Sequence, residues 1–254
     1  CMDWRHGDTA AVDAAFAAAE HKVTMRFVNH RIVTNPMEPR GVIGSFDPAT
    51  DRYTAHVSSQ AIHANRDFAA RWLGTTPDKV RFIAPDVGGG FGAKNFTYPE
   101  HALIPWAARK IGRPVKWIAS RSEVFLSDHQ ARDHHAEATL ALDKDGTFLA
   151  LRVSSVACLG AYMCGGAGGL QTFQYPHLQG TVYAIPAIEI LVKSVLANVT
   201  PIGVTRGPGF AETVNILERL IDVAARRCGF DRAELRRRNF VRETPMTNAF
   251  GFVV

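Results

Sequence analysis

The chain has 254 residues, of which 46% are hydrophobic and 21% charged, with a formal net charge of +5. This length and composition exclude an intrinsically disordered chain and allow a substantial hydrophobic core. The modest positive charge does not by itself indicate a nucleic-acid-binding protein. Six arginines lie on helical patterns near the C-terminus, and we expect them to face solvent: Arg226, Arg227, Arg232, Arg236, Arg237 and Arg238.

No apolar run approaches the ~18 residues of a membrane-spanning helix, and no leader typical of secretion precedes the first strand pattern. The four cysteines, Cys1, Cys158, Cys164 and Cys228, have neither CxxC nor metal-ligand spacing. Cys158 and Cys228 are expected to be buried as small hydrophobic residues. These features predict a reducing, cytoplasmic location. The start at Cys1 and the absence of an evident terminal element predict a piece of a longer polypeptide.

In the first half of the chain, predicted strands alternate with predicted helices. Residues 65–74 form an amphipathic helix pattern that ends at Gly74, with Phe68, Ala69, Trp72 and Leu73 on one face. Residues rich in β-branched side chains, or bounded by turn clusters, predict strands, and a second helix is predicted to end at Gly112 despite Pro105. The predicted strands are 21–33, 52–59, 79–85 and 114–120, and the second helix is 99–112.

The second half begins with a predicted hairpin over 135–157, in which Asp145 and Gly146 form the turn. A turn-rich segment (160–180) and a strand (187–199) follow. A helix over 211–229 has Val214, Leu217, Leu220, Ile221, Ala224 and Cys228 on one face. Asp231 is predicted to cap a last helix, with Glu234 completing a capping box. This order of elements predicts an α+β fold of mixed strands and helices.

The segment DVGGGFGAKN, residues 86–95, places four glycines in five positions between a predicted strand and a predicted helix. That order suits an anion site. A Walker A motif is excluded, because Asn95 stands where Ser or Thr should follow the lysine. A dinucleotide fingerprint fits only as Gly88-x-Gly90-x-x-Ala93, and residues 108–118 contain no carboxylate to bind the ribose. Nucleotide binding and close helix–sheet packing without any ligand both stay open on this loop alone.

Other common chemistries have no support in the sequence. There is no GxSxG motif, which excludes the usual hydrolase nucleophile. His134 and His135 are adjacent and are expected to point to opposite faces of a strand, which is poor geometry for one metal ion. The remaining histidines have no companion at ligand spacing, so packing or surface roles are expected for most of them.

Seven segments together indicate a family. They occur in this order: NPMEPR (35–40), SSQ (58–60), DVGGGFGAK (86–94), RPVKW with SRSE (113–123), YAIPAI (183–188), TRGPG with a following Glu (205–212) and DRAELRRRNF (231–240). In register they resemble the molybdenum-cofactor-binding large subunit of the xanthine dehydrogenase, aldehyde oxidase and carbon monoxide dehydrogenase family. The resemblance implies that residues 1–254 are the first molybdopterin-binding domain of a longer subunit. Residues 1–20 would then connect it to a preceding hammerhead-like domain.

The resemblance also implies a set of cofactor-binding residues. The metal is held by the dithiolene of a pterin and has no protein ligand, so the protein cradles the pterin and shapes the open face of the metal. Gln60 matches the glutamine whose amide hydrogen-bonds an oxo group of molybdenum. Gly90, Phe91 and Gly92 match the loop that approaches the metal, and Arg206 matches an arginine near the pterin and metal ligands.

Three candidate substrate-pocket positions depart from better-known branches of the family. Asn95 replaces a glutamate of the xanthine oxidisers, and Pro208 replaces their substrate-stacking aromatic residue. Gly207 stands where carbon monoxide dehydrogenases have a copper-binding cysteine. These departures argue against xanthine or carbon monoxide as the substrate and leave aldehydes or N-heterocycles.

By this resemblance the protein takes part in a molybdenum hydroxylase, in which an electron-poor carbon receives oxygen derived from water. The cofactor would be molybdenum–molybdopterin or its cytosine dinucleotide form. Electrons would pass to 2Fe-2S and FAD centres on an iron–sulfur small subunit and an FAD-binding medium subunit. The family's general base is a glutamate beyond residue 254, whereas Glu38, Glu100 and Glu212 are expected to be structural.

A second hypothesis is a non-catalytic module that binds cofactor or partners as an isolated or split fragment. The two hypotheses differ in whether a companion polypeptide supplies the second half of the cofactor site and its glutamate. On either hypothesis these 254 residues alone are expected to show no turnover.

Overall fold

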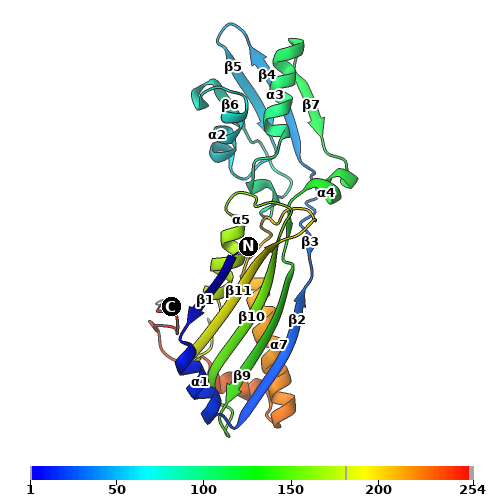
Figure 1. The fold of residues 1–254 in the computed structure, drawn as a ribbon. Coiled ribbons are helices and arrows are strands. Elements are labelled where there is room, and N and C mark those ends of the chain that lie inside the picture. The colour runs from blue at the N-terminus through cyan, green and yellow to red at the C-terminus, as the bar shows by residue number, and fades with distance from the viewer. Residues whose placement is uncertain (1, 181, 252–254) are drawn as a thin grey trace. The chain divides into compact units, whose positions relative to one another are not determined.

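A computed structural model describes residues 2–180 and 182–251, and Figure 1 shows its ribbon. The chain divides into two compact units. Unit 1 contains the described residues within Cys1–Ile32, Arg132–Ile202 and Gly207–Val254, and unit 2 contains Val33–Ala131 and Gly203–Arg206. The prediction for Cys1 lies outside the described residues.

Strands and helices are interspersed along the whole described chain, which confirms the predicted α+β class. The elements of unit 1 are β1 (Met2–Gly7), α1 (Thr9–Ala18), β2 (His21–Asn29), β9 (His134–Leu142), β10 (Phe148–Gly160), α5 (Ala167–Gly169), η3 (Leu170–Gln174), α6 (Tyr175–His177), β11 (Ala187–Leu196), α7 (Phe210–Cys228) and α8 (Arg232–Asn239). Those that lie wholly in unit 2 are β4 (Gly41–Asp47), β5 (Arg52–Val57), α2 (Ile62–Trp72), η1 (Pro77–Lys79), β6 (Val80–Ile83), η2 (Ala93–Asn95), α3 (Glu100–Ile111), β7 (Val115–Ile118), α4 (Arg121–Ser127) and β8 (Gln130–Ala131). The two-residue strand β3 (Ile32–Val33) stands where the chain passes from unit 1 to unit 2.

Unit 1 is built on a five-stranded sheet in the order β1-β11-β10-β9-β2. Only the β10–β11 pair is parallel, and the other three pairs are antiparallel. The long helix α7 packs against β2 and β9 and buries its apolar stripe in the main core, while α1 packs against β10 and β11 (Figure 1). Val12 of α1 is fully buried against small side chains, Ala141, Ala150 and Ala187, which let the helix approach the strands closely.

Unit 2 is built on a four-stranded sheet in the order β6-β5-β4-β7, in which only β5 and β6 are parallel. Helix α3 packs on β4 and β7, and α2 packs on β6. The closest approach is at Gly44 of β4, where an added Cβ would lie 2.6 Å from the backbone nitrogen of Pro105 in α3. Pro105 is therefore accommodated in the helix on the buried side, facing a position without a side chain.

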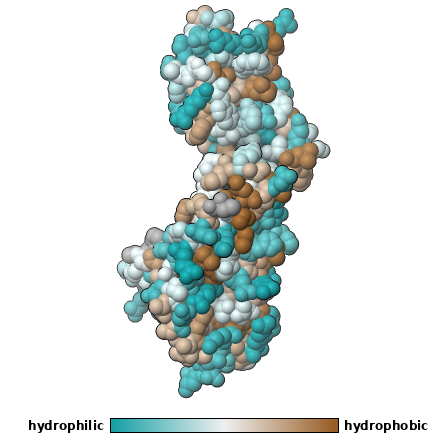
Figure 2. Space-filling view, in the orientation of Figure 1, coloured by the Kyte–Doolittle hydropathy of each residue, from teal (hydrophilic) through white to brown (hydrophobic). Residues whose placement is uncertain are grey.

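Most of the predicted elements are present, with shorter strands and some different faces. In α2 the buried residues are Asn65, Ala69 and Ala70, whereas Phe68 and Trp72 are 46% and 54% exposed, so the predicted apolar face was wrong at both aromatic positions. On the predicted face of α7, Val214 is 54% exposed and Cys228 is only half-buried, whereas the remaining residues are buried as predicted: Leu217, Leu220, Ile221 and Ala224. Tight packing against the sheet favours the alanine side of α2, which periodicity does not reveal. Figure 2 shows hydrophobic side chains at the surface among hydrophilic ones.

The predictions for the second half of the chain and for its first residues can also be compared with the structure. The 135–157 hairpin is confirmed as β9 and β10, with Gly146 at φ +87° in its turn. The segment 160–180 contains the short helical turns α5, η3 and α6 instead of turns alone. Residues 2–18 form β1 and α1, and the predicted link from a preceding domain stays a prediction. None of the helices in the described chain combines the length and hydrophobicity needed to cross a membrane.

Candidate functional site

The glycine loop leaves the end of β6 and closes with the single 3-10 turn η2. Helix α3 begins only at Glu100, with Pro99 at its N-cap. The expected order of strand, glycine loop and helix is therefore interrupted, and the loop does not lie on the N-terminus of a long helix. This removes the helix dipole from the nucleotide interpretation of the loop.

Backbone conformation explains why glycines are needed at the centre of the loop. Gly92 has φ +104°, and a Cβ there would lie 2.6 Å from the carbonyl oxygen of Val204. A Cβ at Gly90 would lie 2.4 Å from Oε1 of Gln60. Phe91, between them, also has positive φ at +51°. The loop is thus pressed against Gln60 and the Val204 backbone at distances that only glycine permits.

Gln60 lies just before α2, and its side-chain amide is held by the glycine loop. The Gly92 N–H donates to Oε1 of Gln60 at 2.8 Å. Because the backbone N–H can only donate, the bonded atom must be the amide oxygen, which leaves the Nε2 donor directed elsewhere. Gln60 is exposed, so this neutral donor is accessible to a group outside the protein.

Arg206 lies beside Phe91. Its backbone N–H donates to the carbonyl oxygen of Phe91 at 2.8 Å, and its guanidinium carbon lies 4.7 Å from the centroid of the Phe91 ring. Both side chains are exposed. The structure therefore brings all five predicted cofactor-binding residues together in unit 2: Gln60, Gly90, Phe91, Gly92 and Arg206.

The three candidate substrate-pocket residues belong to two different units. Asn95 is exposed at the end of η2, and its N–H donates to the carbonyl oxygen of Gly92 at 3.1 Å. Gly207 and Pro208 belong to unit 1 and lead into α7, where the Gly207 carbonyl accepts from the Ala211 N–H at 3.3 Å. Their role in a substrate pocket stays a prediction.

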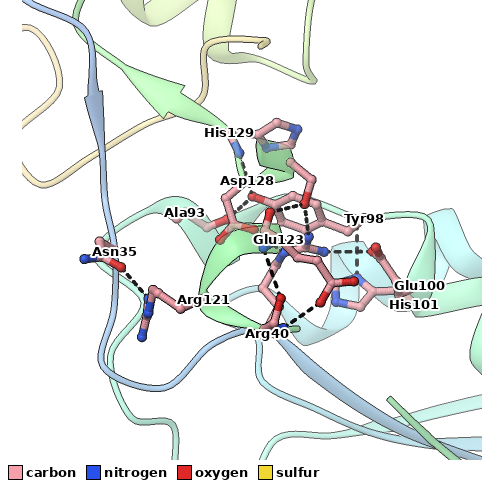
Figure 3. Close-up of polar contacts among 12 residues, drawn as sticks. Asn35, Arg40, Ala93, Tyr98, Glu100, His101, Arg121, Glu123, Asp128 and His129 are labelled. Atoms are coloured by element: carbon pink, nitrogen blue, oxygen red, sulfur yellow. Dashed lines mark hydrogen bonds and ion pairs between the residues drawn. The ribbon is translucent and has the colours of Figure 1, made fainter. Parts of the chain in front are cut away.

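A buried arginine, Arg40, is linked to the glycine loop through Tyr98 (Figure 3). Arg40 is 3% exposed and contacts Asp128 and Glu100 through ion pairs of 2.7 Å each. Its guanidinium lies 3.8 Å from the centroid of the Tyr98 ring, and the Tyr98 hydroxyl donates to the carbonyl oxygen of Ala93 in η2 at 2.9 Å. Burial would lower the pKa of Arg40, but the Asp128 and Glu100 carboxylates raise it above its ordinary value.

Two carboxylates that lie near the sequence motifs are engaged in ion pairs, as expected for structural residues. Glu100 pairs with Arg40, and the fully buried Glu212 lies 3.3 Å from Arg132. No group of three or more His, Cys, Asp or Glu side chains in the described chain is arranged to hold a metal ion. His134 is fully buried and His135 is exposed, which confirms that they point to opposite faces of β9.

We expect Gly92→Ala to lower the free energy of unfolding by about 2 kcal/mol. Alanine is strained at the positive φ of this position, and its Cβ would clash with the Val204 carbonyl. Gly112→Ala is the matched control, because Gly112 has φ +66° but nothing within 4 Å of its added Cβ. Denaturant unfolding of both variants gives the difference. If both variants lose the same free energy of unfolding, the contact with Val204 does not contribute to the need for glycine at position 92.

Comparison with known proteins gives a consistent set of matches. Residues 1–240 match the family model of the molybdopterin cofactor-binding domain. The chain is 38% identical over 254 residues to the carbon monoxide dehydrogenase large chain of Hydrogenophaga pseudoflava, covering 98% of this chain and 32% of that protein. It is 34% identical over 244 residues to the nicotine 6-hydroxylase large subunit of Paenarthrobacter nicotinovorans, covering 95% and 30%.

Solved structures share the fold over nearly the whole chain. Carbon monoxide dehydrogenase from Oligotropha carboxidovorans superposes with a TM-score of 0.90 at 32% identity, covering 99% of this chain and 32% of that one. Quinoline 2-oxidoreductase from Pseudomonas putida 86 also has a TM-score of 0.90 at 32% identity, covering 100% and 32%. The chain thus spans 32% of the length of each of these structures.

Proposed function

Because the chain belongs to the family of molybdopterin cofactor-binding domains, we propose that it cradles the molybdenum cofactor in a molybdenum hydroxylase. The observation that carries this proposal is the fixed amide of Gln60. Its oxygen is occupied by the Gly92 N–H, which orients the Nε2 donor for a group bound outside the loop. A neutral donor of this kind can bind an oxo group without adding charge to the site.

The residues present fit such a cofactor. Gly90 and Gly92 let the loop backbone pack directly against Gln60 and Val204, which holds the Gln60 amide in place, and the exposed Arg206 lies beside Phe91. We propose that Gln60, Phe91, Gly92 and Arg206 contact the pterin and the metal face. When bound, the cofactor would supply two-electron oxidation of a carbon centre with oxygen derived from water. The residues of this chain bind it, orient it and keep its substrate face open.

For the substrate we propose an aldehyde or an N-heterocycle. Two relatives, nicotine 6-hydroxylase and quinoline 2-oxidoreductase, are named for N-heterocycles. Gly207 carries no thiol with which to bind copper, and Asn95 and Pro208 differ from the residues of xanthine oxidisers. These three positions therefore favour neither carbon monoxide nor xanthine. We place the general base, a glutamate, beyond residue 254.

We further propose that the enzyme works as a complex with an iron–sulfur small subunit and an FAD-binding medium subunit. Relatives named as a large chain, a large subunit and a complex subunit support a multi-subunit assembly. Because the cysteines of the sequence lack the spacing of an iron–sulfur cluster site, we place the iron–sulfur centres on other chains and the protein in a reducing cytoplasm. The cofactor would be molybdopterin or its cytosine dinucleotide form.

The proposal is tested on the complex purified with its natural companion chains. We expect about one molybdenum atom and one pterin per copy of this chain, measured by metal analysis and by pterin fluorescence after oxidation. A complex that contains no molybdenum and carries bound NAD(P) instead would overturn the proposal in favour of the nucleotide interpretation.

Two variants of Gln60 test whether its side chain acts as a hydrogen-bond donor to the cofactor. Gln60→Glu retains an oxygen that accepts from Gly92 but cannot donate, while Gln60→Ala loses both functions. We expect both variants to lower turnover of the holoenzyme by about tenfold, with little change in the unfolding midpoint. Unchanged turnover in Gln60→Glu would contradict a donor role for this amide.

A further inference from the structure

The two ends of the glycine loop are joined through a single carboxylate oxygen. Oε2 of Glu38 accepts from the Gly88 N–H at 2.7 Å, from the Ser58 hydroxyl at 2.8 Å and from the Lys94 ammonium at 2.7 Å. The Glu38 N–H also donates to the Gly88 carbonyl at 3.2 Å. Glu38 therefore contacts the residue at which the loop begins to turn and the residue at which it closes.

The ion pair of Glu38 and Lys94 is linked to Gln60 by two routes. The carbonyl oxygen of Lys94 accepts from the Gln60 N–H at 3.0 Å, which fixes the backbone from which the amide projects. The side chain of Gln60 is held by Gly92, which lies between Gly88 and Lys94 in the closed loop. A movement of Lys94 would therefore displace both the backbone and the side-chain partner of Gln60.

The contact between Lys94 and Glu38 is a charged one, an ion pair of 2.7 Å. The Lys94 side chain is 1% exposed, and burial lowers its pKa although the Glu38 carboxylate opposes that change. Burial would raise the pKa of Glu38, but the donors Lys94, Ser58 and Gly88 lower it below its ordinary value. A carboxylate oxygen that accepts three hydrogen bonds is held as the anion and is not suited to accept a proton from substrate.

We propose that Glu38 and Lys94 are positioning residues that close the glycine loop and thereby hold Gln60 and the Phe91–Gly92 backbone in place for the cofactor. This inference rests on the proposed function for its link to the cofactor. The hold on Gln60 itself is a property of this chain and can be measured without the cofactor.

Hydrogen exchange of three amides tests the proposal directly. The N–H groups of Gln60, Gly88 and Gly92 donate to Lys94, Glu38 and Gln60 respectively, so each reports one contact of the closed loop. In Lys94→Met we expect exchange of the Gln60 and Gly92 amides to accelerate by about tenfold or more, because a charge-assisted contact is lost. Amides of the β4–β5 ladder should keep their rates. The control is Lys144→Met, at an exposed lysine in the β9–β10 turn.

A second variant keeps the test decisive if a lone substitution fails to fold. Glu38→Gln combined with Lys94→Met removes both charges with side chains of similar size, so no buried charge is left unpaired. We expect the Gln60 amide to exchange as fast in this double variant as in Lys94→Met. Unchanged exchange at Gln60 and Gly92, or equal acceleration at every amide of unit 2, would overturn it.

Measurements on the assembled complex link the pair to the cofactor. In Lys94→Met we expect turnover to fall about tenfold with an unchanged KM, since the loop and not the substrate is displaced. If the wild-type complex holds no molybdenum, the proposed function fails, and the exchange result still decides whether the pair holds Gln60. If wild-type and Lys94→Met complexes turn over alike, the link to the cofactor is refuted.

Discussion

Replacing Arg40 with methionine is expected to lower the free energy of unfolding by about 3–5 kcal/mol. Arg40 is 3% exposed, and its removal would leave Asp128, also 3% exposed, without the partner of its ion pair. Glu100 would lose the same partner. Burial already raises the pKa of Asp128 in spite of the attraction of Arg40, so the variant would favour its protonation. The measurement is denaturant unfolding at neutral pH.

A surface ion pair supplies the control for this variant. Arg26 contacts Glu137 at 2.8 Å, but the two side chains are 87% and 50% exposed. Arg26→Met should therefore lower the free energy of unfolding much less than Arg40→Met does. Arg40→Lys should fall between the two, because an ammonium keeps the charge but cannot reproduce the guanidinium contacts. A loss in Arg40→Met no larger than in Arg26→Met would contradict the buried-pair account.

Two histidines beside Arg40 should make stability fall as the pH is lowered. Burial and, to a smaller extent, the positive charge of Arg40 lower the pKa of both His101 and His129 from 6.5 to about 4. Both are neutral in the folded chain, while the unfolded chain binds protons below about pH 6.5. The contribution of the two neutral histidines to the free energy of unfolding is thus fully present above about pH 6.5. It is lost as the pH falls toward 4, by about 3 kcal/mol for each histidine.

The check is the pH dependence of the denaturant midpoint between about pH 7 and about pH 5. A His101→Gln/His129→Gln double variant should show a flatter dependence, since neither glutamine titrates. His135→Gln, at an exposed position, should keep the wild-type slope. A double variant with the full slope would assign the pH dependence to other groups.

Much of the secondary structure was readable from local patterns. Helices α3 and α7 end at Gly112 and Gly229 as predicted, and both glycines are left-handed there. Asp231 accepts from the N–H groups of Ala233 and Glu234 to cap α8. These features depend on neighbours within a few residues, so the sequence contains the whole cause. The apolar face of α2 was misread because Phe68 and Trp72 satisfy a helical period without being the residues that the sheet covers.

The strands around the N-terminus show the limit of local patterns. No element was predicted within residues 1–20, yet β1 pairs along its length with β11 almost two hundred positions later, from Met2 opposite Ser194 to Gly7 opposite Glu189. By contrast, the N-cap of the seven-residue helix α4 is Ser120, which forms a complete capping box with Glu123, a signal that the sequence contained. The first was hidden by distance along the chain, and the second was readable.

At the candidate site, the sequence by itself determined the family and, through it, which residues are predicted to bind the cofactor. The glycine run, Gln60 and Arg206 stood in register with a known family, and the family match over residues 1–240 confirmed that assignment. Only the tertiary structure decided how they act together. Gln60 is held through Gly92, Gly92 needs its glycine because of Val204, and the loop is closed by a carboxylate fifty residues before it. Contacts of this kind join segments far apart in the chain, and their geometry follows from packing, which no local pattern encodes.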